Sequence, residues 1–217
     1  MASKAQQKAI AKAILERYPE SYAEALHINV GKNTPAPLYQ WLLCSLLMSA
    51  RINANQAQQA AAALFDAGWT TPDKMAATTW EQRVKVLNEN GYARYDESTA
   101  RYIADTTEII NDRYAGDLRN LRKEAENDPE RERELLQQFK GIGKVGADIF
   151  FREVQIAWDE HFPFVDRKAA EAAADLGLDS EAPADLAGKR ENLPRLLTGL
   201  VRAALDDAKD DILKAAA

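Results

Sequence analysis

The chain has 217 residues and a formal net charge of −6, and its 39 alanines against 10 glycines give a strongly helix-favouring composition. A chain of this length buries about 70% of its unfolded surface and needs no disulfide or metal to fold. The single cysteine, Cys44, excludes an internal disulfide, a zinc site built from cysteines and an iron–sulfur cluster held by four thiolates. Because His27 and His161 are the only histidines, we expect no dedicated transition-metal site, and no pattern in the chain predicts a cofactor.

The apolar stretches of the chain are too short for a membrane span. The longest, residues 41–50, is about half of the roughly 20 residues that a span requires, and it contains Ser45 and Ser49. Residues 1–12 lack the apolar core of a signal peptide. We therefore expect a cytoplasmic protein that does not contact a membrane.

The negative charge is concentrated in one segment. Residues 171–187 contain five acids and no base, so this window contributes −5 of the net charge of −6. Residues 140–168 hold five bases against five acids and can still present a basic face. The net charge therefore does not exclude nucleic acid as a partner, although binding to phosphates depends on Lys and Arg.

The sequence predicts an all-α fold of about ten helices joined by short loops, with no convincing strand alternation. Asn53 is a suitable N-cap for one helix, which Gly68 can close, and Thr79 with Gln82 fits a capping box for another. Residues 27–37 are expected to form a linker, and the charged residues 122–134 a solvated helix or loop. The expected helices span residues 4–17, 39–50, 53–65, 79–90, 97–114, 135–139, 144–158, 166–176 and 193–213.

Residues 136–150 contain the most informative pattern, a helix, a glycine-bounded turn and a second helix. Gly141 and Gly143 permit backbone conformations that other residues avoid, and Ile142 between them can insert into the core. The free amides at the start of the second helix would then point outward and suit a DNA phosphate, with Lys140 and Lys144 beside them. The alternative interpretation is an ordinary glycine-closed turn between two helices.

The flanking residues make this stretch resemble the helix-hairpin-helix DNA glycosylase superfamily, whose type member is endonuclease III. The apolar positions of that motif are occupied by Leu136, Phe139, Ile142, Ala147 and Phe150. Two more blocks occur in the family's order. Residues 46–53 are similar to a segment that lies at the DNA minor groove, and residues 164–168 resemble the family's Val-Asp-Thr-His, with Asp166 in the place of its catalytic aspartate. Residues 91–103 also resemble a family segment, so the resemblance covers about residues 39–178.

The resemblance implies two helical domains. A six-helix barrel with the helix-hairpin-helix motif would span residues 36–160, and residues 1–35 with 161–217 would form the second domain. In the family, DNA lies across the groove between the two domains. Asp166 would lie at that groove.

The resemblance gives Asp166 a chemical role, whereas its position before an alanine-rich helix also fits an ordinary N-cap. Cleavage of an N-glycosidic bond builds positive charge at the sugar C1′ atom. A carboxylate about 4 Å away would stabilise that charge by roughly 4 kcal/mol, about a thousandfold in rate. Asp166 could also orient or deprotonate the attacking water.

The chain departs from the family at three places. Bifunctional members have a Schiff-base lysine where this chain has Val145, which forms no imine, and the neighbouring Lys144 points about 100° away on a helix. The iron–sulfur loop of many relatives is absent, so the tail must be held by apolar packing of Leu193, Leu196, Leu197, Leu200, Val201 and Leu205. Adenine-excising relatives carry a glutamate within the segment that corresponds to residues 46–49, and none is present here.

A few residues are candidates for contact with a flipped-out base. Arg51 stands where relatives use a glutamine to fill the gap in the duplex; it could stack there, bind a phosphate, or be only a charged residue at a helix end. Tyr92, Trp41 and Phe164 are candidate walls of a base pocket, although most aromatic residues at helical spacing belong to the core.

These observations predict a monofunctional DNA glycosylase without lyase activity. We expect it to act as a monomer on double-stranded DNA that contains a damaged base, with an alkylated base among the candidate lesions, and to associate with the nucleoid when bound. One alternative is a non-catalytic DNA-binding or lesion-sensing protein, which the replacement of the family's Thr-His by Arg167 and Lys168 favours. Another is an unrelated helical interaction domain.

Overall fold

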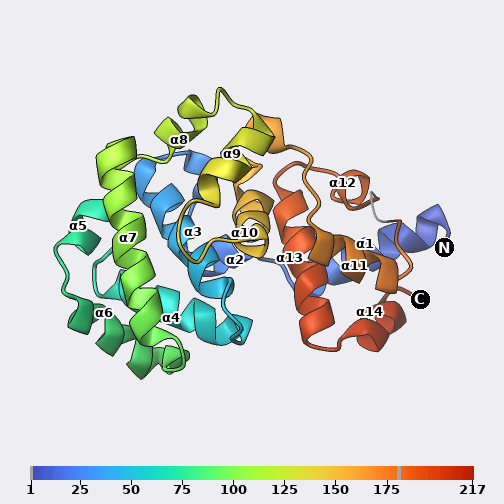
Figure 1. The fold of residues 1–217 in the computed structure, drawn as a ribbon. Helices are drawn as coiled ribbons and strands as arrows, with labels where there is room; N and C mark the ends of the chain where they lie inside the picture. The colour runs from blue at the N-terminus through green and yellow to red at the C-terminus, as the bar shows by residue number, and fades with distance from the viewer. Residues whose placement is uncertain (1, 180–181) are drawn as a thin grey trace. The chain divides into compact units, whose positions relative to one another are not determined.

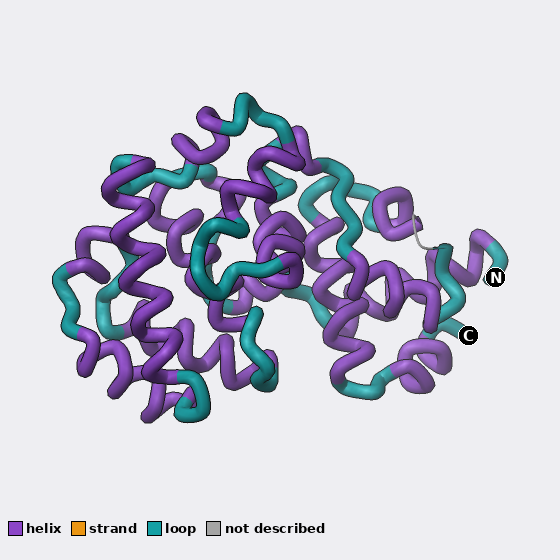
Figure 2. The backbone as a smooth tube through the Cα atoms, viewed as in Figure 1, coloured by secondary structure: helices purple, strands orange, loops and turns teal. Residues whose placement is uncertain are grey.

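The structure is a computed structural model that describes residues 2–179 and 182–217 (Figures 1 and 2). These residues form α-helices and short helical turns and contain no strand, so the all-α prediction is confirmed. The α-helices are α1 (Lys4–Arg17), α2 (Tyr22–Ala25), α3 (Pro35–Met48), α4 (Ala54–Asp66), α5 (Pro72–Ala76), α6 (Trp80–Leu87), α7 (Asp96–Tyr114), α8 (Arg119–Glu124), α9 (Pro129–Leu136), α10 (Lys144–Val154), α11 (Arg167–Asp175), α12 (Ala182–Leu186), α13 (Asn192–Leu205) and α14 (Lys209–Ala215).

The chain forms two compact units. The hairpin unit is Ile28–Phe150, and the terminal unit joins Met1–His27 to Phe151–Ala217. The sequence predicted boundaries at 36 and 160. Both observed boundaries come earlier in the chain, and at the second one the division falls within α10, whose last turn joins the terminal unit.

Glu181, one of the five acids of the 171–187 window, lies outside the described residues.

In the hairpin unit, α3 is the central buried helix. It begins earlier than expected because Pro35 occupies its first turn, where a missing amide proton costs nothing. Nine of its residues are buried, since nearly every position from Leu38 to Leu47 is apolar. Elsewhere in the same unit, the long helix α7 packs against the two short helices α5 and α6 (Figure 1).

The local signals for helix starts are accurate in this unit. Asn53 caps α4 by accepting a hydrogen bond from the amide of Asn55, and Gly68 adopts a positive φ of 89° just beyond the helix. The Thr79 hydroxyl accepts from the Gln82 amide at 3.2 Å, and the Gln82 side chain accepts from the Thr79 amide at 2.8 Å. Both predictions are confirmed.

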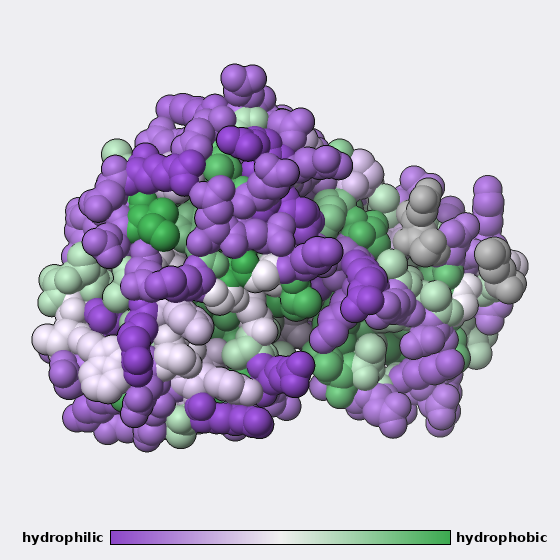
Figure 3. Space-filling view, viewed as in Figure 1, coloured by the Kyte–Doolittle hydropathy of each residue, from purple (hydrophilic) through white to green (hydrophobic). Residues whose placement is uncertain are grey.

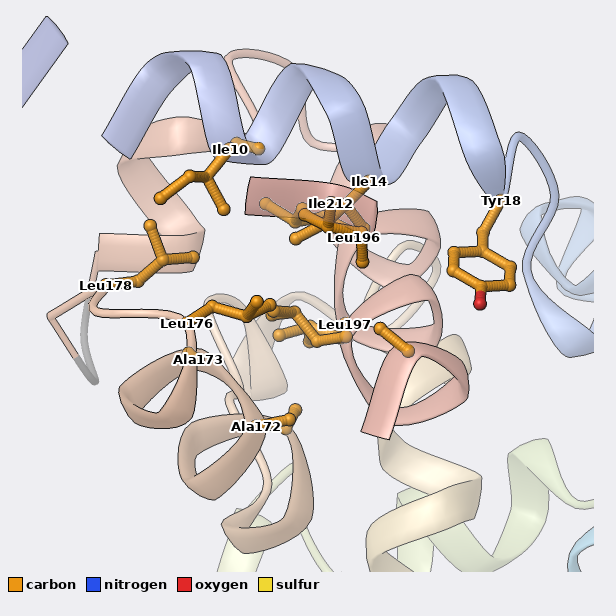
Figure 4. Close-up of a cluster of buried hydrophobic side chains, with 14 of the residues drawn as sticks. Ile10, Ile14, Tyr18, Ala172, Ala173, Leu176, Leu178, Leu196, Leu197 and Ile212 are labelled. Atoms are coloured by element: carbon orange, nitrogen blue, oxygen red, sulfur yellow. The ribbon is translucent and has the colours of Figure 1, made fainter. Parts of the chain in front are cut away.

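The terminal unit has its own apolar core, formed mainly by α1, α11 and α13 (Figure 4). α1 contributes Ile10, which faces Leu178, and Ile14, which lies beside Leu196 of α13. Gly199 of α13 brings this contact close, because a Cβ there would lie 2.6 Å from Cγ2 of Ile14. The residues expected to hold the tail are buried except Leu205, which is 55% exposed at the end of α13, so that part of the prediction is wrong.

The expected single helix over residues 193–213 is two helices. α13 ends at Leu205, and α14 begins at Lys209. Between them Asp207 adopts a left-handed conformation with φ of 52°, and the Ala208 amide turns back to the Ala203 carbonyl at 2.9 Å. The apolar stripe continues through Ile212, which is why the pattern of leucines conceals the break.

The described residues contain no helix that is both long and apolar enough to cross a membrane. The face seen in Figure 3 is covered mainly by hydrophilic residues, with small apolar areas between them.

Candidate functional site

The helix-hairpin-helix turn is formed as the sequence predicts. The Ile142 amide donates to the Phe139 carbonyl at 3.0 Å, and the Ile142 side chain is buried in the core. Gly141 adopts a φ of 87°, a left-handed conformation that favours glycine. The first amide of α10 with a backbone acceptor is that of Ala147, which donates to the Gly143 carbonyl at 3.0 Å. The amides before it are the unpaired donors at the start of the helix.

The three glycines around this turn differ in whether the structure requires a glycine there. At Gly141 a Cβ would lie 3.1 Å from Cδ2 of Tyr102, so the hairpin backbone rests on that ring. At Gly146 a Cβ would collide with the Ser49 hydroxyl, which shows how closely the start of α10 approaches the end of α3. Gly143, in contrast, has neither a positive φ nor any atom within 4 Å of a Cβ, so the prediction that its conformation requires glycine is wrong.

The cationic residues proposed for DNA contact are all exposed. Lys140 forms an ion pair with Asp105 at 2.7 Å, and this carboxylate raises the pKa of the lysine. Lys144 at the first position of α10 and Arg51 beyond the end of α3 are also exposed. Val145, in the place of the family's lysine, is 51% exposed. Arg152 differs from these residues because it is buried and cannot belong to a basic face.

The proposed base-pocket aromatics lie in different environments. Trp41 is fully buried, and its indole nitrogen donates to the Phe150 carbonyl at 3.1 Å. Tyr92 is also fully buried; its hydroxyl donates to the Leu47 carbonyl at 2.7 Å, and burial raises its pKa to about 12. Phe164 in the terminal unit is partly exposed and packs edge-on against Phe151. In this conformation neither Trp41 nor Tyr92 offers a ring face to a base.

Asp166 lies at the N-terminus of α11 in the terminal unit and is almost wholly buried. One carboxylate oxygen, Oδ1, accepts from the amides of Lys168 and Ala169 at 3.1 and 3.3 Å. Arg152 forms a fork with the same carboxylate: its Nη2 donates to Oδ1 at 2.9 Å and its Nε to Oδ2 at 2.7 Å. The side chains of Arg152 and Asp166 are only 3% and 2% exposed. The N-cap that the sequence predicted is therefore present, together with an ion pair that it did not predict.

This environment determines the charge of Asp166. Burial raises the pKa of its carboxyl, but the charge and hydrogen bonds of Arg152 and the two amides outweigh burial and hold the pKa below its ordinary value. Burial likewise lowers the pKa of Arg152, and Asp166 reverses that effect and raises it. The pair therefore stays ionised at neutral pH.

The loop that carries Asp166 is anchored by Gln155. Its amide nitrogen donates to the Phe164 carbonyl at 3.0 Å and its amide oxygen accepts from the Phe164 backbone nitrogen at 2.9 Å. His161 stacks on the Phe151 ring at 3.9 Å between centroids, so it packs within the unit. Sequence reasoning missed the roles of Arg152 and Gln155. A signal was available for Arg152: it follows Phe150 and Phe151 on a helix that is otherwise largely apolar, and a charge that becomes buried there is tolerated only when it is paired.

No group of three or more His, Cys, Asp or Glu side chains within residues 2–179 and 182–217 is arranged to hold a metal ion.

The fold resembles solved structures of endonuclease III. A structure described as a non-covalent endonuclease III–DNA complex matches with a TM-score of 0.55 and 18% identity, over 94% of this chain and 86% of that chain. The chain therefore has the endonuclease III fold. A trapped endonuclease III–DNA covalent intermediate, an estranged-adenine complex, matches over the same shares with a TM-score of 0.52 and 16% identity. No family model and no curated protein sequence matches the chain.

Within the endonuclease III fold, this chain carries no cysteine cluster. Cys44 is its single cysteine and lies buried in α3. In the terminal unit the packing of α1 and α11 on α13 buries the apolar side chains instead.

Proposed function

We propose that the chain is a monofunctional DNA glycosylase. The hairpin binds a phosphate of duplex DNA through the amides at the start of α10, with Lys140 and Lys144 beside it, and Arg51 contacts the DNA near the site from which the base is flipped. The endonuclease III structures that the fold resembles are DNA complexes, which supports DNA as the partner. The damaged base leaves by hydrolysis of its N-glycosidic bond.

The observation that carries this proposal is the anionic carboxylate of Asp166 at the start of α11, in a chain with the endonuclease III fold. In the reaction, a water oxygen forms a bond to C1′, and the electron pair of the breaking bond leaves with the base. Asp166 stabilises the positive charge that develops at C1′ and accepts the proton of the water.

Val145 carries the second part of the proposal, the absence of lyase activity. Lyase chemistry in this family requires an amine that forms an imine with the sugar, and a valine side chain has none. Lys144, the adjacent residue, projects about 100° away around the helix and serves as a phosphate contact.

A second candidate function is a lesion-sensing protein that binds damaged DNA and does not cut it. The buried ion pair favours it, because the charge of Asp166 is already balanced by Arg152 and its side chain is only 2% exposed. Under this hypothesis the hairpin still binds DNA, and Asp166 acts only as a helix cap and an ion-pair partner.

Excision from a panel of lesion-containing duplexes, each cleaved with alkali to reveal abasic sites, separates the two functions. The glycosylase proposal expects cleavage of at least one lesion by the wild-type protein and its loss in Asp166→Asn. An Asp166→Asn protein that excises as fast as wild type removes Asp166 from the mechanism. Binding to abasic-site DNA without excision of any lesion supports the lesion sensor instead.

Borohydride trapping on the excised substrate tests the lyase prediction. We expect no covalent protein–DNA adduct with the wild-type chain, whereas a lysine-dependent enzyme forms one. A trapped adduct with the wild-type chain would overturn the prediction, because it shows that an amine of this chain attacks the sugar.

A further inference from the structure

We infer that Arg152 is a positioning residue for Asp166: it fixes the direction of the carboxylate and keeps it an anion although the group is buried. This inference rests on the proposed function, because it concerns the same carboxylate. Arg152 touches neither DNA nor a reacting atom in this role. It acts through Asp166.

The contact geometry supports a positioning role. The guanidinium reaches both carboxylate oxygens, with its Nε 2.7 Å from Oδ2 and its Nη2 2.9 Å from Oδ1. A planar fork that holds both oxygens fixes the plane of the carboxylate, which a single point charge does not. The amides of Lys168 and Ala169 then hold Oδ1 from the helix side. Donors on two helices thus restrict the rotation of one side chain.

Burial explains why the carboxylate needs this partner. A buried carboxylate without a counter-charge protonates, and a protonated Asp166 would neither stabilise positive charge nor accept a proton from water. The two cap amides alone are the ordinary partners of an exposed N-cap aspartate. Arg152 supplies the positive charge that allows the same residue to remain an anion inside the terminal unit.

The other ionisable groups around the pair act mainly on the arginine. Tyr22 of α2 and Glu153, the next residue on α10, both influence the charge of Arg152. Glu153 is buried, accepts a hydrogen bond from the Tyr22 amide at 3.0 Å, and has a pKa that burial raises. The residues that flank Asp166 on α11, Arg167 and Lys168, are exposed. Arg152 is therefore the charged side chain that faces Asp166 within hydrogen-bond distance.

The test is a titration of the Asp166 carboxyl by carbon NMR, with the resonance assigned by its absence in Asp166→Asn. In the wild-type protein we expect Asp166 to titrate below the ordinary value of about 3.9, and in Arg152→Gln above it. Lys12→Gln is the matched control, because Lys12 lies on α1 of the same unit, outside the segments that resemble the family, and its side chain is 76% exposed and lies 3.7 Å from Glu16. Arg152→Lys keeps the charge and loses the fork. Arg152→Met, which removes the charge and adds no unpaired polar group, replaces Arg152→Gln in the titration if the latter does not fold.

Excision kinetics supply the second readout. We expect the rate at pH 7 to fall about tenfold or more in Arg152→Gln, to be partly restored in Arg152→Lys, and to be unchanged in Lys12→Gln. The acid limb of the pH profile should move to higher pH in Arg152→Gln. A merely structural role would not move this limb.

The outcomes distinguish this inference from the proposed function. An Asp166 carboxyl that titrates at the same pH in wild type and Arg152→Gln overturns the inference, as does an unchanged excision rate and pH profile in Arg152→Gln. If the wild-type protein excises no lesion, the proposed function fails. The titration alone then decides whether Arg152 keeps Asp166 charged.

Discussion

At the scale of single residues, the helix-hairpin-helix turn requires glycine at positions where a side chain would collide with a neighbour. Gly141 rests on the ring of Tyr102 and has a left-handed backbone, whereas a Cβ at Gly146 would collide with the hydroxyl of Ser49 and touch the side chain of Ile142. That hydroxyl donates to the Ser45 carbonyl at 2.5 Å, so it is held in place and cannot easily move aside. The close approach of α3 and α10 therefore depends on the missing side chain of Gly146 and the small one of Ser49.

Replacement of Gly146 by alanine should destabilise the protein by about 1–3 kcal/mol, because the added methyl group meets a tethered hydroxyl. In a Ser49→Ala background the same change should be neutral or stabilising by up to about 1 kcal/mol, since alanine favours a helix over glycine. Urea unfolding of the two single variants and the double variant measures this difference. Equal effects of Gly146→Ala in both backgrounds would show that Ser49 is not the obstacle.

The residues that sequence reasoning identified correctly are those whose partners lie nearby in the chain. Asp166 was predicted as an N-cap because a cap binds amides two and three residues ahead. Its ion pair with Arg152 was not predicted, because the two residues are separated by the end of α10 and the loop anchored by Gln155. Burial of Tyr92 and Trp41 depends on the packing of several helices, and the sequence does not reveal it.

At the scale of helices, the starts of α4 and α6 were predicted from their capping residues, whereas the unmarked break within residues 193–213 was missed. The capping box at Thr79 fixes the start of α6, whereas the break between α13 and α14 lies at Asp206 and Asp207, where neither glycine nor proline marks it. The end of α7 at Tyr114 was predicted correctly, and the residue that caps it is unusual. This C-cap residue, Ala115, adopts a left-handed conformation with φ of 52° and ψ of 40°.

Replacement of Ala115 by glycine should stabilise the protein by about 0.5–1 kcal/mol. A left-handed conformation costs an L-residue roughly 1–2 kcal/mol, and the greater freedom of glycine in the unfolded chain offsets about half of that gain. Ala104→Gly within α7 is the control, and it should destabilise by about 1 kcal/mol. Thermal unfolding measures both changes, and a lower melting temperature for Ala115→Gly would contradict the argument.

At the scale of the whole molecule, the distribution of charge matters more than its sum. The net charge of −6 includes an acidic window at residues 171–187, whereas Lys140 and Lys144 are exposed beside the amides at the start of α10. Counter-ion release depends on the cations that meet phosphates and not on the net charge of the chain. An acidic protein with the endonuclease III fold can therefore bind DNA through a small basic area.

Replacement of Lys144 by glutamine should weaken binding to duplex DNA and make it less dependent on salt. Each phosphate contact contributes about −0.9 to the slope of log K against log salt concentration, so the slope should become less steep by about that amount. Lys85→Gln is the matched control. Lys85 is 71% exposed on α6, far in sequence from the turn between α9 and α10, and it pairs with Glu89 at 3.9 Å. Fluorescence anisotropy across a salt series measures both slopes. Equal slopes for Lys144→Gln and wild type would remove Lys144 from the phosphate contacts, and an equal loss in Lys85→Gln would indicate a general effect of charge.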